Sequence, residues 1–226
     1  MSTPTRNGTI GHFELEETLG EGGMGRVYRA RPLAGGRPVA LKLLDIRGRR
    51  KPARLLELFE REYHTLAQLS HPSVIQVFDY GREGDRAYYA MELLEGEPLH
   101  VHRGIDHRQL CSILHDVASC LALLHSRRLV HRDVTTRNII VTGPASAKLI
   151  DFGALAQMGP VGALVGTPPY VPPEAAWMQP LDGRADLYAL GVVLYRMLTG
   201  RYPYRARSVG ELPALWQEKP TAPHLI

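Results

Sequence analysis

The sequence has little cysteine and no long apolar run. Its 226 residues include two cysteines, Cys111 and Cys120, which lie nine positions apart in a helical pattern. At ~100° per residue they face opposite sides of that helix, so they cannot bridge each other, and this usage indicates a reducing compartment. The N-terminus MSTPTRNGTI lacks the apolar segment of a signal peptide, and no stretch approaches the ~18 apolar residues of a membrane span. These absences predict a soluble, cytoplasmic protein with no membrane segment.

Neither sign of charge dominates the chain. The formal net charge is +4, and the basic residues are dispersed apart from the run RGRRK at 47–51. A solvated loop before a helix explains this run better than a nucleic-acid surface, so no nucleic-acid partner is predicted. With 44% hydrophobic residues, the chain is able to bury a core in one large domain or in two small lobes.

The first part of the sequence reads as short strands around one helix. Residues 1–10 are polar and are predicted to be flexible. Pro52 opens a helix that is predicted to end at Leu69, before Ser-His-Pro72. Strands are predicted at 13–20, 25–30, 37–44, 74–81 and 87–96.

The pattern changes after Gly96. Apolar residues from Leu110 to Leu124 recur at helical spacing, which predicts an amphipathic helix packed on a core. A second helix at 186–200 is apolar nearly all round, so we expect it to be buried. The reading is an α+β domain at 11–226, with a strand-rich N-lobe at about 11–95 and a mainly helical C-lobe at about 96–226.

The glycines at 20–27, GEGGMGRV, fit the pattern G-x-G-x-x-G-x-V. On its own this pattern fits a turn as well as a phosphate site. A dinucleotide-binding fingerprint would continue into a helix, whereas RVYRA continues as a strand. This favours a glycine-rich hairpin whose backbone N–H groups approach phosphates.

Lys42 lies in a predicted strand beside apolar residues. A lone strand lysine is usually a surface residue. The helix from Pro52 offers it a partner, because Glu62 falls within about 60° of five apolar residues on a helical wheel, whereas Glu57 and Glu60 point the opposite way. A carboxylate on a buried apolar stripe needs a counter-charge, and Lys42 is the natural candidate.

The stretch HRDVTTRNII at 131–140 sets an acid beside two bases, and an amide follows. This composition fits either a solvated turn or a working site. Asp151 of the sequence DFG follows the predicted strand AKLI. A carboxylate at a strand end, together with Asn138, provides a pair of oxygen ligands suited to Mg²⁺.

In order and spacing these motifs, with GTPPYVPPE at 166–174 and RAD at 184–186, resemble those of protein kinases. The segment GEGGMGRVY is similar to that of the bacterial eukaryotic-like (Hanks-type) Ser/Thr protein kinases. The resemblance extends from about Phe13 to Tyr204. It implies a two-lobed kinase fold and an enzyme that transfers the γ-phosphoryl group of ATP, with Mg²⁺, to Ser/Thr hydroxyls of protein substrates in signalling.

The resemblance also implies catalytic roles. Lys42 would hold the α- and β-phosphates, and Glu62 would orient Lys42. Asp133 would accept or align the proton of the substrate hydroxyl, and Thr167 would hydrogen-bond Asp133. The metal ligands would be Asn138 and Asp151.

The nucleotide site implied by the resemblance comprises the glycine-rich hairpin, the purine pocket and the segment that reads adenine. Its residues would be Leu19, Gly20, Gly22, Gly25, Val27, Ala40, Lys42, Met91, Glu92, Leu94 and Ile140. An apolar column linking the lobes would consist of His131, Phe152, Leu66 and Val77.

The chain departs from the family pattern at two places. Ser/Thr kinases carry a lysine two positions after the catalytic aspartate, where this chain has Thr135, and Arg137 could supply the missing cation, as an arginine does in tyrosine kinases. The segment GTPPY nevertheless favours Ser/Thr substrates. The family also continues through further helices after Trp216, so the C-lobe is expected to be truncated and another domain or subunit to cover its base.

The loop at 154–166, ALAQMGPVGALVG, contains no serine, threonine or tyrosine. In kinases with an arginine before the catalytic aspartate, as Arg132 is here, a phosphate on this loop commonly pairs with that arginine. No phosphate is possible in this segment. We therefore predict that packing of apolar residues holds the loop instead, namely Leu155, Met158, Val161, Leu164 and Val165.

Three functions are compatible with these residues. The favoured one is an active Ser/Thr protein kinase. A nucleotide-binding pseudokinase or regulatory scaffold would explain Thr135 and the short C-lobe, but the intact set Lys42, Asp133, Asn138 and Asp151 argues against it. A small-molecule phosphotransferase is disfavoured by the peptide-docking segment at 166–174.

Overall fold

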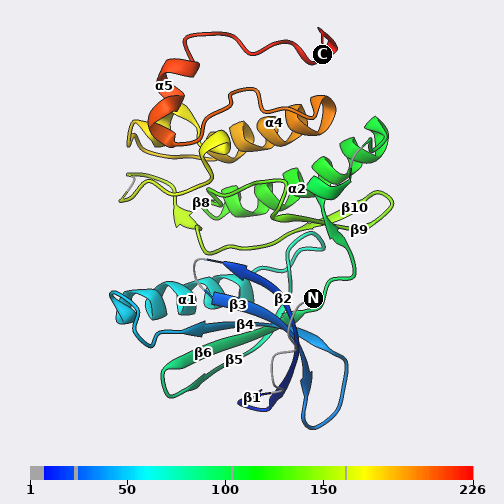
Figure 1. Ribbon diagram of the computed structural model, residues 1–226, viewed down its shortest axis with the longest axis vertical. Helices are drawn as coiled ribbons and strands as arrows, with labels where there is room; N and C mark the ends of the chain where they lie inside the picture. The colour runs from blue at the N-terminus through cyan, green and yellow to red at the C-terminus, as the bar shows by residue number, and fades with distance from the viewer. Residues whose placement is uncertain (1–7, 23–24, 103, 161, 226) are drawn as a thin grey trace. The chain divides into compact units, whose positions relative to one another are not determined.

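The computed structural model describes residues 8–22, 25–102, 104–160 and 162–225 (Figure 1). Two compact units are present. The first contains the chain up to Ser70 together with Ile75–Glu95, and the second contains His71–Val74 and the chain from Gly96. No helix within the described residues is both long enough and apolar enough to cross a membrane.

The first unit is built on a six-stranded antiparallel sheet with the strand order β1-β2-β3-β4-β6-β5. One helix, α1, packs against β5 and β6. The element bounds are β1 Thr9–Ile10, β2 Phe13–Gly22, β3 Gly25–Pro32, β4 Val39–Asp45, α1 Pro52–Ala67, β5 Val77–Glu83 and β6 Arg86–Glu92.

The alternation of side chains along β6 divides its tyrosines between the two faces of the sheet. Tyr88 packs edge-on against Phe13 in a core cluster, with ring centroids 6.0 Å apart. Tyr89 faces α1, where its ring centroid lies 5.0 Å from that of Phe59. The sheet is therefore buried on the helix side as well as on the side of the core cluster.

The prediction of a flexible segment at 1–10 is wrong for its last residues. Thr9–Ile10 forms β1, and Ile10 is buried against Phe13 because the strand pairs with β2. Residues 1–7 lie outside the described residues.

The strand predicted at 74–81 begins later, at Val77, because Val74 pairs with Leu149 in an isolated bridge of the second unit. The backbone N–H of Leu149 donates to the Ser73 carbonyl at 2.9 Å. His71–Val74 therefore packs with the second unit, although the sequence placed it in the N-lobe.

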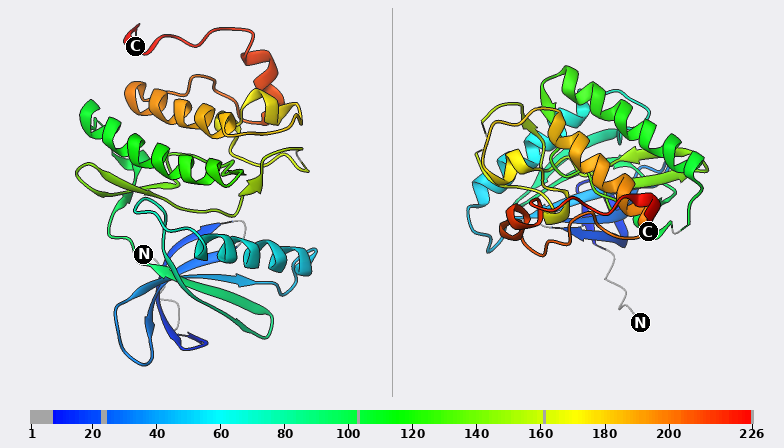
Figure 2. Two further views of the ribbon diagram at one scale, coloured as in Figure 1. Left: turned by 180° about the vertical axis from the view of Figure 1, so that it is seen from behind. Right: turned by 90° about the horizontal axis from the view of Figure 1, so that it is seen from above.

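The second unit is mainly helical, with a three-stranded sheet β10-β9-β7 and a two-stranded sheet β11-β8. Figure 2 shows its two long helices, α2 and α4, side by side, in agreement with their contacts. The bounds are β7 Glu97–Pro98, η1 Leu99–Val101, α2 His107–Ser126, β8 Leu129–Val130, β9 Ile139–Gly143, β10 Ser146–Leu149, β11 Ala156–Gln157, η2 Pro168–Tyr170, α3 Pro173–Ala176, α4 Arg184–Thr199, η3 Val209–Glu211, α5 Leu212–Leu215 and η4 Pro223–Leu225.

Helix α2 confirms the predicted amphipathic stripe. Asp106 caps its first turn by accepting hydrogen bonds from the backbone N–H groups of Arg108 and Gln109. Cys111 is exposed and Cys120 is buried, and both are free thiols. Burial raises the pKa of Cys120 to about 12, so this cysteine is a protonated part of the core.

The predicted burial of the second helix is only half right. Helix α4 buries the face that contains Ala189 and Val193, but its outer leucines are 37–52% exposed. Only one side of the helix packs on α2 and η2, and no described residue fully covers the other. The exposed leucines are Leu187, Leu194 and Leu198.

Candidate active site

The predicted ion pair between Lys42 and Glu62 is present. The Lys42 ammonium lies 2.8 and 2.9 Å from the two carboxylate oxygens of Glu62. Both side chains are buried, at 10% and 1% exposure, because Lys42 lies on the central strand β4 and Glu62 on the inner face of α1. Removal of one partner of such a pair leaves the other as an unpaired buried charge, which lowers the stability of the fold by roughly 3–5 kcal/mol.

Two further contacts join α1 to the sheet. The Tyr89 hydroxyl donates a hydrogen bond to Oε1 of Glu62 at 3.1 Å. The Tyr80 hydroxyl donates to Oε1 of Glu60 at 2.8 Å, and Glu60 is half-buried rather than turned away from the sheet as predicted. Glu57 is exposed, as predicted.

The glycine-rich hairpin connects β2 and β3, and residues 23–24 within it lie outside the described residues. At Gly25 a Cβ atom would lie 2.2 Å from the backbone oxygen of Leu43, so only glycine fits there. A Cβ at Gly20 or Gly22 would meet nothing within 4 Å. These two glycines leave the surface of the hairpin open.

The remaining predicted nucleotide residues are distributed over both units. In the first unit Val27 pairs with Lys42, and Ala40 pairs with Met91, which places four of them in adjacent strands. Ile140 lies on β9 of the second unit. The others of the first unit are Leu19, which is 47% exposed in β2, Glu92 at the end of β6, and Leu94 just after it.

The proposed apolar column is divided in the same way. His131 and Phe152 of the second unit stack edge-on, with ring centroids 4.8 Å apart. Leu66 is buried in α1 and Val77 begins β5, both in the first unit. A column that joins all four residues stays a prediction.

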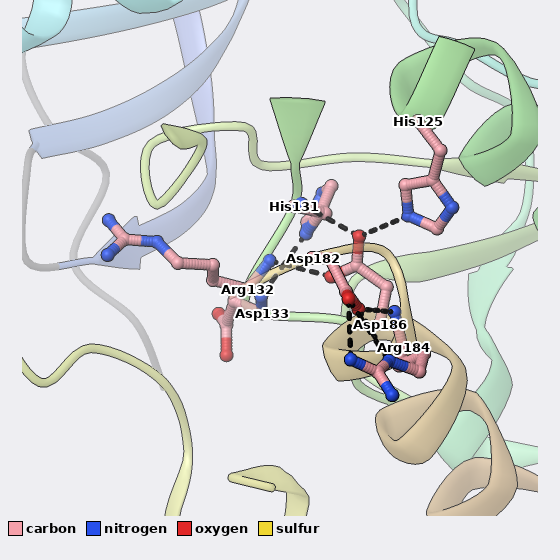
Figure 3. Close-up of polar contacts among 7 residues, drawn as sticks. All are labelled: His125, His131, Arg132, Asp133, Asp182, Arg184 and Asp186. Atoms are coloured by element: carbon pink, nitrogen blue, oxygen red, sulfur yellow. Dashed lines mark hydrogen bonds and ion pairs between the residues drawn. The ribbon is translucent and has the colours of Figure 1, made fainter. Parts of the chain in front are cut away.

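The candidate catalytic loop, residues 131–138, is anchored by Asp186, which is fully buried in the first turn of α4 (Figure 3). Its carboxylate accepts hydrogen bonds from the backbone N–H groups of His131 and Arg132, both at 2.9 Å. Nε2 of His125 lies 2.8 Å from Oδ2, and since a carboxylate only accepts, this nitrogen donates. The anchor fixes the backbone at Arg132, which adopts a left-handed φ of 67°.

Asp133 is oriented by two donors. The Thr167 hydroxyl donates to Oδ1 at 3.0 Å, which confirms the predicted contact. The amide nitrogen of Asn138 donates to Oδ2 and to the Asp133 carbonyl, both at 2.9 Å. The carboxylate is partly exposed, so it remains accessible to a substrate hydroxyl.

Asn138 and Asp151 are brought together by their backbones. The N–H of Ile150, the residue before Asp151, donates to the Asn138 carbonyl at 2.8 Å. Because the amide nitrogen of Asn138 is engaged by Asp133, its side-chain oxygen remains as an acceptor. Among the described residues no group of three or more His, Cys, Asp or Glu side chains could hold a metal. A carboxylate oxygen and an amide oxygen are both kinds of ligand that hard cations take in proteins.

The two threonines of the loop are structural. Thr135 is 4% exposed, and its hydroxyl accepts the backbone N–H of Arg137 at 3.3 Å. Thr136 is 1% exposed and shares a hydrogen bond of 3.2 Å with the Tyr170 hydroxyl. Arg137 is exposed, and within the described residues no acidic side chain pairs with it.

The loop at 154–166 is held mainly by its backbone. Strand β11 pairs with β8, and the N–H groups of Met158 and Gly159 donate to the carbonyls of Arg128 and Leu181, both at 2.8 Å. Nε of Arg132 donates to the Ala154 carbonyl at 2.6 Å. The arginine that would receive a phosphate thus contacts the loop directly.

The predicted apolar packing of this loop holds only for its first part. Leu155 is buried and Met158 packs on a core cluster. Leu164 and Val165 are 42% and 38% exposed. Val161 lies outside the described residues.

Sequence reasoning missed three residues of this site. The sequence marks Asp186 only as the last residue of the RAD motif and gives it no role, and it does not mark His125 at all, although a lone carboxylate in an apolar helix signals a buried acceptor as it does at Glu62. Tyr89 was read only as part of a strand. The alternation of side chains along the strand shows that Tyr89 and Tyr88 lie on opposite faces of the sheet. It does not show that the Tyr89 hydroxyl reaches Glu62.

Comparisons with known proteins agree with this geometry. Residues 13–217 match the protein kinase domain. The chain is 35% identical over 210 residues to the serine/threonine-protein kinase pkn2 of Myxococcus xanthus, which covers 86% of this chain and 25% of pkn2. It is 37% identical over 228 residues to the serine/threonine-protein kinase PknB of Mycolicibacterium smegmatis, covering 94% of this chain and 35% of PknB.

A third relative, the serine/threonine-protein kinase PksC of Streptomyces coelicolor, is 35% identical over 236 residues, which cover 96% of this chain and 42% of PksC. The chain therefore spans less than half the length of each of these relatives. The predicted resemblance and the predicted α+β kinase fold are confirmed. By the match over residues 13–217, the chain belongs to the protein kinase domain family.

Proposed function

We propose that this chain transfers the γ-phosphoryl group of ATP to serine and threonine hydroxyls of proteins. The observation that carries the proposal is Asp133, a partly exposed carboxylate held by Thr167 and Asn138. In the transfer, Asp133 accepts the proton of the acceptor hydroxyl, a bond forms from that oxygen to phosphorus, and the bond to the β-phosphate oxygen breaks to release ADP. The ion pair of Lys42 with Glu62 supplies a fixed cation for the phosphates.

A divalent cation, which we propose to be Mg²⁺, would be held by Asn138 and Asp151. When bound it would neutralise charge on the phosphate oxygens. Arg137 would contribute a second positive charge from the protein. The cover of the base of the C-lobe by another domain or subunit stays a prediction.

Incubation with labelled ATP, Mg²⁺ and a generic protein substrate tests the proposed function. We expect labelled phosphoserine and phosphothreonine, and a loss of about 100-fold or more for Asp133→Asn, because the proton acceptor is removed. Asp85→Asn, a change of the same kind at an exposed position in the first unit, serves as the control. Binding of ATP without transfer would favour the pseudokinase, and phosphotyrosine as product would contradict the substrate class.

Titration calorimetry tests the metal assignment independently of activity. Asp151→Ala should weaken ATP binding about tenfold or more in Mg²⁺, because one of two protein oxygens that share the divalent charge is lost. Without a divalent cation the variant and the wild-type protein should bind ATP alike. Equal affinity in Mg²⁺ would remove Asp151 from the metal site.

Arg137 should carry the cationic role that buried Thr135 cannot. We expect Arg137→Ala to lower kcat about tenfold while KM for ATP changes less, because the charge acts on the transition state. Arg108→Ala, which removes an exposed arginine at the start of α2, is the matched control. A kinetically silent Arg137→Ala would show that no compensation occurs there.

Activity should not depend on phosphorylation of the loop at 154–166, since Arg132 already binds its backbone. Exhaustive phosphatase treatment, checked by intact mass, should leave kcat within about twofold of the untreated value. A fall of tenfold or more would refute this independence.

A further inference from the structure

Tyr89 lies at the centre of the contacts that hold the ion pair of the first unit. It is 2% exposed, and its register partner on the neighbouring strand is Lys42. Paired residues of adjacent strands project from the same face of the sheet, so the ring and the ammonium lie together, with Nζ 5.8 Å from the ring centroid. The Tyr89 hydroxyl reaches Oε1 of Glu62, which also accepts from Lys42.

The ring of Tyr89 also packs against helix α1. Its centroid lies 5.0 Å from Phe59 and 6.0 Å from Tyr63. Tyr63 in turn lies 5.2 Å from Tyr80, whose hydroxyl holds Glu60. The helix that carries Glu62 is therefore fixed to the sheet by rings and by two hydroxyl–carboxylate hydrogen bonds.

The chemistry of the pair explains why a third donor matters. Lysine and glutamate side chains have many rotamers, so an ion pair alone fixes neither of them. A tyrosine has two torsions, and here both are restricted by the surrounding rings. A hydroxyl presented from this rigid ring donates to a charged acceptor, which is a strong form of hydrogen bond. It selects one position of the Glu62 carboxylate, and through it one position of the Lys42 ammonium.

We propose that Tyr89 is a positioning residue for phosphoryl transfer, which acts on Lys42 through Glu62. The inference rests on the proposed function. Tyr89 would hold α1 and Glu62 in position through contacts within the first unit, without a phosphorylated residue. Because Tyr89 touches neither substrate nor nucleotide in this role, its removal should affect the placement of Lys42 rather than the chemistry of Asp133.

Tyr89→Phe tests the proposal, because it keeps the ring and removes the hydroxyl alone. We expect kcat to fall about tenfold, the lower range for a hydrogen bond to a charged group, while KM for ATP changes less than about twofold. Tyr88→Phe removes the same atom from the next residue of β6, on the opposite face of the sheet, and should keep kcat within about twofold. Equal effects of the two variants would overturn the proposal. Lys42→Met gives the baseline without the cation.

Thermal unfolding provides a second measurement that needs no activity. Tyr89→Phe should lower the Tm by about 2–4 °C in the wild-type background and have no effect in a Glu62→Ala background, where the acceptor is gone. The same fall in both backgrounds would mean that the hydroxyl does not act through Glu62, and would refute the inference. If the wild-type protein transfers no phosphate, the proposed function fails, and this cycle still decides whether the Tyr89 hydroxyl acts through Glu62.

Discussion

A carboxylate buried away from water must be surrounded by donors, and each unit of this protein is organised around one. In the first unit Glu62 collects the Lys42 ammonium and the Tyr89 hydroxyl. In the second, Asp186 collects two backbone N–H groups of the catalytic loop and the imidazole of His125. The residues that would do chemistry are thus fixed by the need to satisfy a buried charge. Removal of a donor from either carboxylate would leave a buried charge partly unsatisfied, which is costly.

The loop that follows Asp151 is ordered by a different means. Its sequence offers no hydroxyl for a phosphate, and the structure pairs β11 with β8 and closes the contact between Arg132 and Ala154. Backbone hydrogen bonds do not depend on a modification, whereas a bond between arginine and phosphate does. Among the described residues after Gly159, Leu164 and Val165 are exposed. Order in this segment therefore comes from strand pairing more than from apolar packing.

A residue's contacts can be predicted from the sequence when its partner is a side chain, and much less well when its partner is the backbone. The pair of Lys42 and Glu62 can be predicted, because helical spacing places Glu62 on an apolar stripe and the strand residue Lys42 offers a side-chain counter-charge. Asp186 has the same signature, but its donors are largely backbone N–H groups, which no residue pattern marks. The apolar circumference of α4 shows that the helix needs cover, yet it cannot show which side receives it. Sequence patterns therefore predict that a buried carboxylate has donors and that an apolar face has a packing partner. Only the structure shows which groups these are.

The two threonines of the catalytic loop illustrate the same limit. From the sequence they mark the position of an absent lysine, and the structure places both hydroxyls inside, where one accepts from Arg137 and the other meets Tyr170. A side chain that closes a buried turn is unable to reach a phosphate at the same time. Arg137, the cation that we propose for this loop, is exposed, and the Thr135 hydroxyl accepts its backbone N–H. Thr135 thus stands where Ser/Thr kinases carry a lysine, and its hydroxyl holds the backbone of Arg137, the residue that we propose replaces this cation.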